Sequence, residues 1–490
     1  MKLNREILRL AIPSILANIT VPLVGMVDIA VVGHLGSTEG FSGAAFIGGI
    51  SVGAMLFDLL YWNFAFLRAG TGGLTAQAYG RLGAKNGSFA PESGKKGVTG
   101  AESALFAPEI CDILGRALRI ALLSGLALIA LQWVVVQAAF LVVDCTPEVR
   151  MLATRYFYIR IWAAPATLSL FALKGWFIGL QDTFRPMLVD LWINLCNILL
   201  SLGLGFGLSS GSLVLLPEMG FAGVAWGTAI AQWTGLLLAL CVARKYLPLS
   251  HLLKVLVQFS NEESQEIADT ERVSDHGEKG ARVFFALNRD LFLRSVGMIA
   301  VYIGFTVLSA RLGDQLLAVS AILMKLLMLF SYFTDGFAYA GEALTGRFIG
   351  ERSLDGVRST VRGTFAWSFA LAGAFMLLYG LGGTPLLKLM TSDASVVEAG
   401  RTYLPWLLLM PLIGCPAFAW DGIFIGATAS KDLRNSTLLC AAGFFAVWFA
   451  GSWLADRSLH LLMAAYFVHL AIRAFYLTVR YKPSVLSLLS

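Results

Sequence analysis

The sequence predicts an all-α membrane protein with 12 transmembrane helices. They form two six-helix bundles, an N-lobe and a C-lobe, related by a pseudo-two-fold axis along the membrane normal around a central cavity. Three observations predict this class of fold. The composition is too apolar for a protein surrounded by water. Twelve apolar runs are long enough to cross a bilayer as helices. Short motifs of the first half return in the same order in the second half.

The composition places most side chains in lipid. Of the 490 residues, 57% are hydrophobic and 14% are charged, and the mean hydropathy is +0.73; a soluble domain is about 25% charged. The six cysteines are scattered without C-x-x-C spacing, so we expect small buried side chains rather than a disulfide or a metal site. The first apolar run is too long for the apolar part of a cleavable signal peptide, so it is expected to be the first span.

Apolar runs of about 20 residues or more mark the predicted spans, because a helix of that length crosses about 30 Å of hydrocarbon. In chain order they cover residues 8–33, 44–72, 114–141, 155–178, 186–207, 221–246, 287–311, 316–345, 361–383, 402–425, 436–455 and 459–480.

Basic residues orient these spans. With the N-terminus in the cytoplasm, 27 of the 37 Lys and Arg residues fall at the termini or in loops on the cytoplasmic side, and seven fall on the outer side. Three, Arg68, Lys174 and Lys325, lie within predicted spans and are counted with neither side, and basic residues toward the span ends are counted with the adjoining loops. The positive-inside rule therefore predicts that both termini are cytoplasmic. We expect a multi-pass protein of the inner (plasma) membrane.

Two polar stretches divide the chain. The run SNEESQEIADTERVSDHGEKG, 260–280, is rich in Glu, Asp and Ser and predicts a cytoplasmic linker at about 251–285. It separates an N-terminal lobe, 1–250, from a C-terminal lobe, 286–490. A Gly-, Ser- and Lys-rich stretch at about 83–109 predicts a cytoplasmic insertion in the first lobe, either a plain loop or a regulatory contact.

The two halves carry the same motifs. VVGHLG at 31–36 corresponds to LSARLG at 308–313, and GGLTAQAYG at 72–80 corresponds to EALTGRFIG at 342–350. The tripeptide FIG occurs at 177–179 and again at 424–426. Because both halves begin on the cytoplasmic side, the repeat is parallel, as in secondary transporters that rock one half against the other.

The motifs of other functional classes are absent from the sequence. There is no G-x-x-x-x-G-K-[ST] motif for an ATP-driven pump, so an ion gradient would have to supply the energy. The five histidines are isolated, and neither metal-ligand spacing nor a nucleophile motif occurs. We therefore expect neither an enzyme nor a bound cofactor, and the only expected ion is the coupling ion, a proton or possibly sodium.

Asp28 stands in the apolar stretch VPLVGMVDIAVVGHLG, 21–36. An ionised Asp at the centre of a membrane helix costs about 2.5–3.5 kcal/mol, so such a residue indicates function. We predict that Asp28 takes up a proton on one side of the membrane and releases it on the other. Pro22 lies six residues earlier and removes a helix hydrogen bond, so it is the predicted bending point of the first span. A buried Asp with only a packing role is the alternative.

Other polar residues within the spans extend the candidate site. Lys174 is predicted either to reach the membrane surface or to pair with Asp28 or Asp190. In the C-lobe, Asp335 and Asp421 are candidates for substrate binding. With Asp190, they would favour a cationic substrate. Aromatic and Met side chains are expected to line the cavity, among them Met26, Tyr61 and Trp62.

Two local pairings are predicted from spacing alone. Asp290 and Arg294 are one helical turn apart and are expected to form an i,i+4 pair. Asp58, Asn63 and Arg68 are expected to form a polar network within the second span.

The chain resembles the multidrug and toxic compound extrusion (MATE) family, within it the DinF-like branch. The motifs that carry the resemblance span nearly the whole chain: NITVPLVGMVDIAVVGHLG (18–36), FLRAGTGGLTAQAYG (66–80), GWFIGLQDTFRPM (175–187), ALNRDLFLRS (286–295), SARLGDQLLAVSAILM (309–324), TDGFAYAGEALTG (334–346) and AWDGIFIGATASKDLRNS (419–436). The resemblance implies two six-helix lobes and export of organic compounds, often cations, coupled to inward flow of protons or sodium.

The resemblance also assigns residues to a cation-coupling site. Asp28 matches the first-helix aspartate of the branch, and Tyr156, Asn197 and Thr228 match the polar positions grouped around it. The sequence departs from the pattern at Ser201, where NILLS replaces a segment that ends in a carboxylate. The lost carboxylate weakens the expectation of a sodium site more than that of a proton site, because sodium needs several hard oxygen ligands.

The expected function is therefore a secondary antiporter that exports organic, cationic or amphipathic compounds in exchange for protons. A sodium-coupled drug antiporter is one alternative. A flippase for lipid-linked precursors is another, although only three basic residues within the spans disfavour it. The expected partners are small drug-like molecules and membrane lipids, without nucleic acid, and the chain is expected to be monomeric.

Overall fold

The computed structural model describes residues 2–35, 43–85, 108–141, 143, 145–210, 213–244, 246, 275–391, 393–454 and 456–489. Three sequence predictions fall wholly or partly outside this description: the insertion over 86–107, the linker over 251–274, and the side chain of Pro22.

Helices make up almost all of the N-lobe. Its elements are α1 (Lys2–His34), α2 (Gly43–Trp62), α3 (Ala65–Lys85), α5 (Pro108–Ala130), α6 (Gln132–Ala139), α7 (Pro147–Arg160), a 3₁₀ turn (Ile161–Ala163), α8 (Ala164–Gly179), α9 (Phe184–Phe206), β1 (Leu208–Ser210), β2 (Leu213–Leu216) and α10 (Gly220–Ala243). The two strands form an antiparallel hairpin between α9 and α10, which the apolar pattern did not predict.

The C-lobe is helical throughout its described residues. Its elements are α13 (Asp275–Ala310), α14 (Asp314–Gly350), α15 (Leu354–Met390), α16 (Ala394–Arg401), α17 (Leu404–Gly426), α18 (Ser430–Leu454), α19 (Leu459–Ser484) and a 3₁₀ turn (Leu486–Leu489). Helix α13 begins within the range predicted for the linker.

The prediction of 12 spans is confirmed. Twelve helical segments of the described chain are long and apolar enough to cross a membrane, and each lobe contributes half of them. Two of these segments are built from consecutive helices. Helices α2 and α3 form one, and α7 and α8, with the 3₁₀ turn before Pro165, form another. Most helices extend past the apolar runs, because helical hydrogen bonding continues where charged side chains reach the membrane surface.

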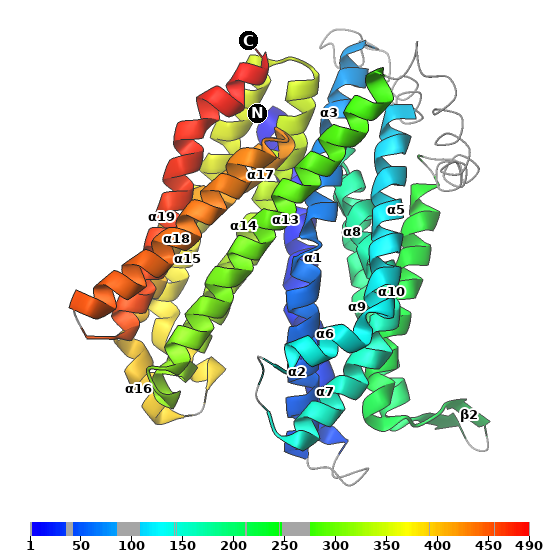
Figure 1. The fold of residues 1–490 in the computed structure, drawn as a ribbon, viewed down its shortest axis with the longest axis vertical. Helices are drawn as coiled ribbons and strands as arrows, with labels where there is room; N and C mark the ends of the chain where they lie inside the picture. Colours follow the sequence, from blue (N-terminus) through cyan, green and yellow to red (C-terminus); the bar gives the residue numbers. More distant parts are fainter. Residues whose placement is uncertain are drawn as a thin grey trace.

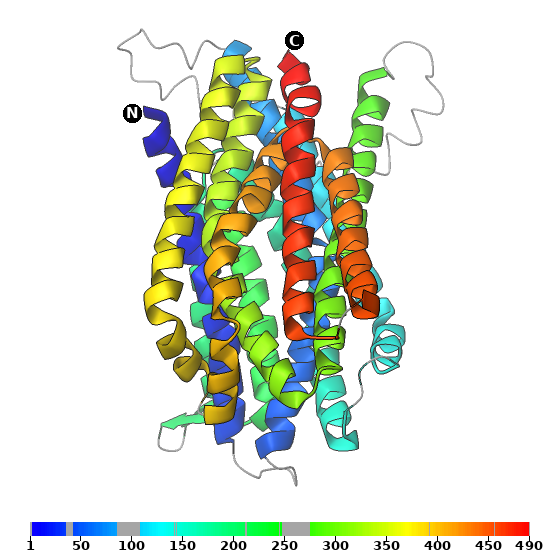
Figure 2. The ribbon, with the colours of Figure 1, turned by 90° about the vertical axis from the view of Figure 1, so that its left-hand side faces the viewer.

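The two lobes lie side by side, and both termini are at the same end of the molecule (Figures 1 and 2). At that end the lobes are packed together: Ile7, Leu10 and Ala11 of α1 form a buried cluster with Phe337 and Ala340 of α14. Figure 1 shows that the ribbons of the lobes diverge toward the opposite end.

Glycines bring α3 and α14 into close contact at the interface between the lobes. A Cβ atom on Gly80 would clash with the main chain of Arg347, and one on Gly350 would clash with the main chain of Gln77. The crossing is therefore formed by main-chain atoms, with no room for a side chain at either glycine. Such small-residue contacts are the usual way for membrane helices to approach closely.

The backbone also shows the repeat predicted from the sequence. Arg352, two residues after the FIG tripeptide at 348–350, has φ 56°. After the two FIG tripeptides that correspond in the repeat, 177–179 and 424–426, the second following residue likewise adopts positive φ: Gln181 has φ 64° and Thr428 has φ 54°. In both turns the same pair of main-chain hydrogen bonds ends the helix, including Asp182 N to Phe177 O and Ala429 N to Phe424 O. A left-handed conformation is costly for a residue other than glycine, so both turns need outside support.

That support comes from the opposite lobe. The amide of Gln181 donates to Ala343 O of α14 at 2.6 Å. The amide of Gln77, on α3, donates to Gly426 O at 3.0 Å and to Thr428 Oγ1 at 3.2 Å. The two turns thus hold the lobes together through related contacts on the end that carries the termini.

Candidate functional site

Asp28 lies inside the N-lobe, on the face of α1 that packs against α9 and α10. Its side chain is buried, and the residue is 6% exposed. The hydroxyl of Ser201, on α9, donates to Asp28 Oδ1 at 3.0 Å. Two residues before Pro22 on α1, Thr20 Oγ1 accepts from Asn194 of α9 at 2.5 Å. Two side-chain hydrogen bonds therefore join α1 to α9, one on each side of position 22.

Asn197 and Thr228 lie beside Asp28, as predicted. Asn197 Nδ2 donates to Thr228 Oγ1 at 2.8 Å, and both side chains are within hydrogen-bonding reach of the Asp28 carboxylate. Asn197 is one helical turn from Ser201, so both face α1. Gly227 lets α10 approach, because a Cβ atom there would lie 2.8 Å from Ser201 N. The Asn197 Oδ1 atom is buried and has no hydrogen-bond partner in the described structure.

Tyr156 completes this group, and it brings Arg160, a residue that the sequence analysis placed on the outer side. Tyr156 is buried, and its hydroxyl accepts from Arg160 Nη1 at 3.0 Å. The Arg160 guanidinium also lies 4.7 Å from the ring centroid of Phe57. Its positive charge acts on Asp28. The one-turn spacing from Tyr156 was the sequence signal that could have placed Arg160 here.

Lys174 pairs with Asp190, one of the two partners considered for it. Lys174 Nζ is 2.6 Å from Asp190 Oδ2, and each side chain is about one-fifth exposed (23% and 22%). This ion pair ties α8 to α9. Lys174 therefore bonds to Asp190 rather than to Asp28, and Asp190 carries its own counter-charge.

The two C-lobe candidate acids also have basic neighbours. Asp421 Oδ2 is 2.5 Å from Arg294 Nη2, and Asp421 accepts a hydrogen bond from Arg473 Nε at 3.2 Å. Asp335 has no direct hydrogen bond in the described structure, but four basic side chains attract it electrostatically: Arg68, Arg473, Arg294 and Lys174. Both acids are thus compensated by cations within the lobes.

The two pairings predicted from spacing are wrong. Asp290 Oδ1 is bound by Arg434 of α18 at 2.6 Å, while Arg294 binds Asp421. Neighbouring helices offer partners with better geometry than a residue one turn away on the same helix.

The network within the second span does not form either. Arg68 pairs with Glu342 of the C-lobe at 3.0 Å, and the amide of Asn63 donates to Leu59 O on its own helix. The count of three basic residues within the spans was also too low. Arg160, Arg294 and Arg473 lie in helical segments that cross the membrane and within the predicted spans 155–178, 287–311 and 459–480, although they had been counted with the adjoining loops.

The three candidate cavity residues point in different directions. Met26 is 66% exposed. Tyr61 packs among aromatic rings of the N-lobe, 5.4 Å from Phe57 between ring centroids. Trp62 contacts the other lobe, with its ring centroid 5.2 Å from that of Tyr302 on α13.

Asp58 is a second acidic residue that the candidate site did not include. It is exposed, one turn before Trp62 on α2, and has no hydrogen bond or ion pair within the described chain. Arg160 of the N-lobe and, after it, Lys325 of α14 attract Asp58 electrostatically, so Asp58 lies between cations of the two lobes. An exposed carboxylate beside aromatic rings, within a membrane segment, is an arrangement suited to an organic cation.

A family model described as MatE matches residues 109–202 and 291–448. The chain belongs to the MatE family. Over 463 residues it is 34% identical to the DNA damage-inducible protein F of Escherichia coli K12, a match that covers 94% of this chain and 89% of the relative. The protein is therefore a multi-pass membrane transporter of the MATE family.

Solved MATE structures share its fold. A MATE crystal structure in the bent conformation superimposes with a TM-score of 0.75 at 16% identity, covering 99% of this chain and 97% of the other. The Vibrio cholerae MATE transporter VcmN in the bent form also gives a TM-score of 0.75, at 15% identity, with coverage of 99% and 98%. The two-lobe fold predicted from the sequence is thus confirmed.

Proposed function

We propose that this MATE transporter exports organic cations in exchange for protons, and that Asp28 is the group that carries the proton. One observation supports this most strongly. Asp28 is buried and is bonded to neutral hydroxyl and amide groups, whereas Asp190, Glu342 and Asp421 each bind a cation directly, and the partly buried Asp335 has four basic side chains around it.

The neighbours of Asp28 can satisfy both of its protonation states. The ionised carboxylate accepts from Ser201. A protonated carboxyl group needs an acceptor, and the unpartnered Oδ1 atom of the neighbouring Asn197 is the candidate for that role. Protonation of Asp28 would thus supply the partner that Asn197 Oδ1 lacks in the ionised state, which lowers the cost of the neutral carboxyl group.

Proton uptake requires a conformational change, because Asp28 is only 6% exposed. Protonation removes the charge that strengthens the bond from Ser201. The segment of α1 after position 22 then loses its attachment to α9, while Thr20 stays bonded to Asn194. We propose that α1 bends at Pro22 between these two anchors, which opens Asp28 to one side of the membrane at a time.

The charges favour a proton over sodium. A sodium ion would bring a full positive charge beside Asp28, where Arg160 already acts and where Ser201 replaces a second carboxylate. A proton neutralises Asp28 and adds no net charge to the rest of the group. The unpartnered Oδ1 atom of Asn197 is an oxygen that could also bind sodium, so sodium is the alternative that the experiment tests.

A lipid-linked precursor flippase has less support. The cations of the spans are more numerous than the sequence suggested, but Arg68 and Lys174 each bind a carboxylate, and Arg294 and Arg473 share one. These four are therefore not free to hold a lipid phosphate; of the other two, Arg160 binds the Tyr156 hydroxyl, and Lys325 alone has no direct partner in the described structure. We place the chain in the plasma membrane as a monomer, with both termini in the cytoplasm.

The test is ethidium efflux from vesicles that contain the purified protein, driven first by a pH gradient and then by a sodium gradient. We expect the Asp28→Asn variant to lose pH-driven efflux while its amount in the membrane is unchanged, because an amide cannot carry the proton. Glu398→Gln is the control, since Glu398 is an exposed acid paired with Arg401 outside the site. Normal pH-driven efflux by Asp28→Asn would end the proposal. Wild-type efflux that responds only to the sodium gradient would show that sodium, not the proton, is the coupling ion.

A further inference from the structure

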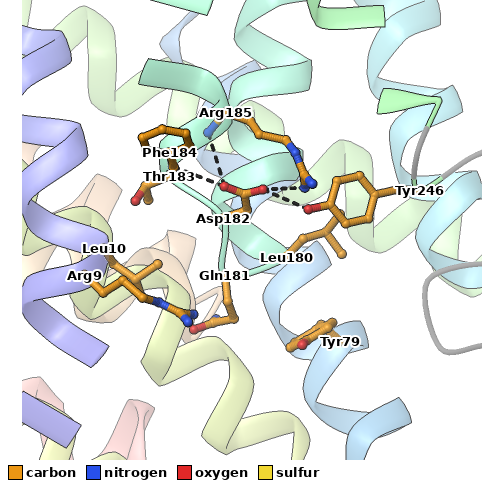
Figure 3. Close-up of a pocket in the computed structure, with 10 residues that line it drawn as sticks. All are labelled: Arg9, Leu10, Tyr79, Leu180, Gln181, Asp182, Thr183, Phe184, Arg185 and Tyr246. Carbon is orange, nitrogen blue, oxygen red and sulfur yellow. Dashed lines mark hydrogen bonds and ion pairs between the residues drawn. The ribbon is translucent and has the colours of Figure 1, made fainter. Parts of the chain in front are cut away.

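A cavity of about 400 Å³ opens at the end of the N-lobe that carries the chain termini (Figure 3). It is bounded by the start of α1, by α3, by the turn between α8 and α9, and by Tyr246 beyond α10. Neither Asp28 nor any other residue of the coupling site lines it. The proposed function therefore leaves this cavity unexplained.

Asp182 fixes one wall of the cavity and uses all of its hydrogen-bonding capacity there. Its Oδ1 atom accepts from the main-chain N–H groups of Phe184 and Arg185 at 3.1 and 3.2 Å. Its Oδ2 atom accepts from Arg185 Nη1 at 2.6 Å and from the Tyr246 hydroxyl at 2.8 Å. Figure 3 shows the Arg185 guanidinium and the Tyr246 hydroxyl on the same side of the Asp182 carboxylate. The negative charge of Asp182 is thus matched by Arg185.

Arg9 leaves the cavity with a positive charge that is not matched. It lines the cavity from α1, it is exposed, and no carboxylate pairs with it within the described chain. Its charge acts on Tyr79, which lines the cavity from α3. Arg9, Arg185 and Asp182 together give the lining a net charge of +1, because the other lining residues are neutral.

Thr183 supplies a polar atom that has no partner. The residue is 3% exposed, it lines the cavity, and its Oγ1 atom makes no hydrogen bond. It stands directly before α9, at the position whose side chain normally caps a helix. Asp182 already binds the first two N–H groups of α9, so the Thr183 hydroxyl is left for another partner. A buried hydroxyl without a partner is unfavourable, and a hydrogen-bonding ligand in the cavity would remove this cost.

The main chain adds no further donor, because the first N–H groups of α9 are used. Phe184 and Arg185 donate to Asp182, Pro186 has no N–H, and Met187 donates to Thr183 O at 3.2 Å. An anion would therefore be held by side chains. The positive end of the 23-residue helix α9 still favours negative charge at this place.

We propose that this cavity binds a phosphate group with one net negative charge, held by Arg9 and by the Thr183 hydroxyl. The phosphate of an anionic lipid headgroup and free inorganic phosphate share this chemistry. A guanidinium and a hydroxyl on one anion form charge-assisted hydrogen bonds of the kind that phosphate accepts. The occupied site would touch the turn that carries Gln181, whose amide binds Ala343 O of the other lobe.

The test measures binding to the full-length protein in detergent, with two probes. One is phosphatidylglycerol compared with phosphatidylcholine, counted as bound lipid by native mass spectrometry. The other is inorganic phosphate, measured by calorimetry. The variants are Arg9→Gln, Thr183→Val and, as the matched control, Arg5→Gln, since Arg5 is an exposed arginine one turn earlier on α1 that does not line the cavity. Equal melting temperatures establish that the variants are folded.

We expect Arg9→Gln to weaken binding by about tenfold and Thr183→Val by about fivefold, as for loss of a charge-assisted and a neutral hydrogen bond. Arg5→Gln should bind as the wild type. If phosphatidylglycerol binding falls in this order among the variants, the proposal is supported and the phosphate belongs to a lipid. If only inorganic phosphate binding falls in this order, the proposal is supported and the ligand is soluble. No binding of either probe, or equal binding by all variants, overturns it. Because transport is not measured, the result is independent of the proposed proton coupling.

Discussion

At the scale of single residues, Ser201 distinguishes the coupling site of this chain from a site with two carboxylates. Its hydroxyl occupies the place of an acid and donates to Asp28 instead of adding a second negative charge. The sequence showed the substitution, and the structure shows that Asn197 and Thr228 remain in place around it. The choice of coupling ion therefore depends on one side chain of α9.

We predict that Ser201→Asp makes efflux respond to a sodium gradient. A second carboxylate beside Asp28 adds a hard oxygen ligand and a negative charge that offsets Arg160, and sodium requires both. The measurement is ethidium efflux and sodium binding in wild-type and variant vesicles. Ser201→Asn is the control, because the Asn side chain has nearly the size and shape of Asp and also adds an oxygen, but it carries no charge. A Ser201→Asp variant that stays indifferent to sodium would show that the missing carboxylate does not set the ion preference.

Asp58 is the residue on which recognition of a cation should depend. It is exposed and unpaired within the described spans, whereas Asp190 and Asp421 are bound by cations. We predict that Asp58→Asn raises the KM for a cationic substrate by about tenfold, the loss of one charge interaction of about 1.4 kcal/mol. Asp58→Glu should stay near the wild type. Efflux assays with a cationic and a neutral fluorescent substrate test this, and an equal loss for both substrates would contradict a role in recognising charge.

At the scale of helices, apolar runs predicted how many spans exist but not how long they are. A run ends where charged residues begin, yet α14 and α15 continue through such residues because their charges reach the surface or a partner. The ends of the runs therefore do not give the ends of the helices.

The partners in the ion pairs could not be predicted from the sequence either. Spacing along one helix suggested Asp290 and Arg294, but tertiary packing gave each a partner on another helix. The residues around Asp28 were found because resemblance to a family supplied contacts between distant segments. No periodicity of a single helix contains that information.

The pair Arg68–Glu342 joins helices α3 and α14 of different lobes, and it makes a prediction at this scale. Glu342 is buried, with a side chain 1% exposed, and Arg68 is 16% exposed. We predict that Glu342→Gln destabilises the protein by about 3 kcal/mol, because Arg68 is left buried without a counter-charge. Thermal unfolding followed by tryptophan fluorescence measures the loss. Arg68→Met combined with Glu342→Met should recover much of it, and if the double variant is no more stable than Glu342→Gln, the pair is not the cause.

At the scale of the whole molecule, the repeat explains how the lobes are held together at one end only. Related turns after the two FIG motifs reach across the interface, and α3 crosses α14 through glycines. The polar contacts between the lobes in the described residues, from Glu6–Arg347 to Asn18–Tyr332, involve the segments nearest the end with the termini. An alternating-access cycle would have to break these contacts and re-form them.

The crossing at Gly80 offers the test of that cycle. A single methyl group at Gly80 would collide with the main chain of Arg347, which cannot move aside as a flexible side chain does. We predict that Gly80→Ala shifts the population toward a state in which the lobes are separated at the end with the termini, so that hydrogen exchange accelerates in α3 and in the second half of α14. The control is Gly373→Ala on α15, because a Cβ atom there meets nothing within 4 Å. If both variants exchange like the wild type, the glycine crossing does not limit closure.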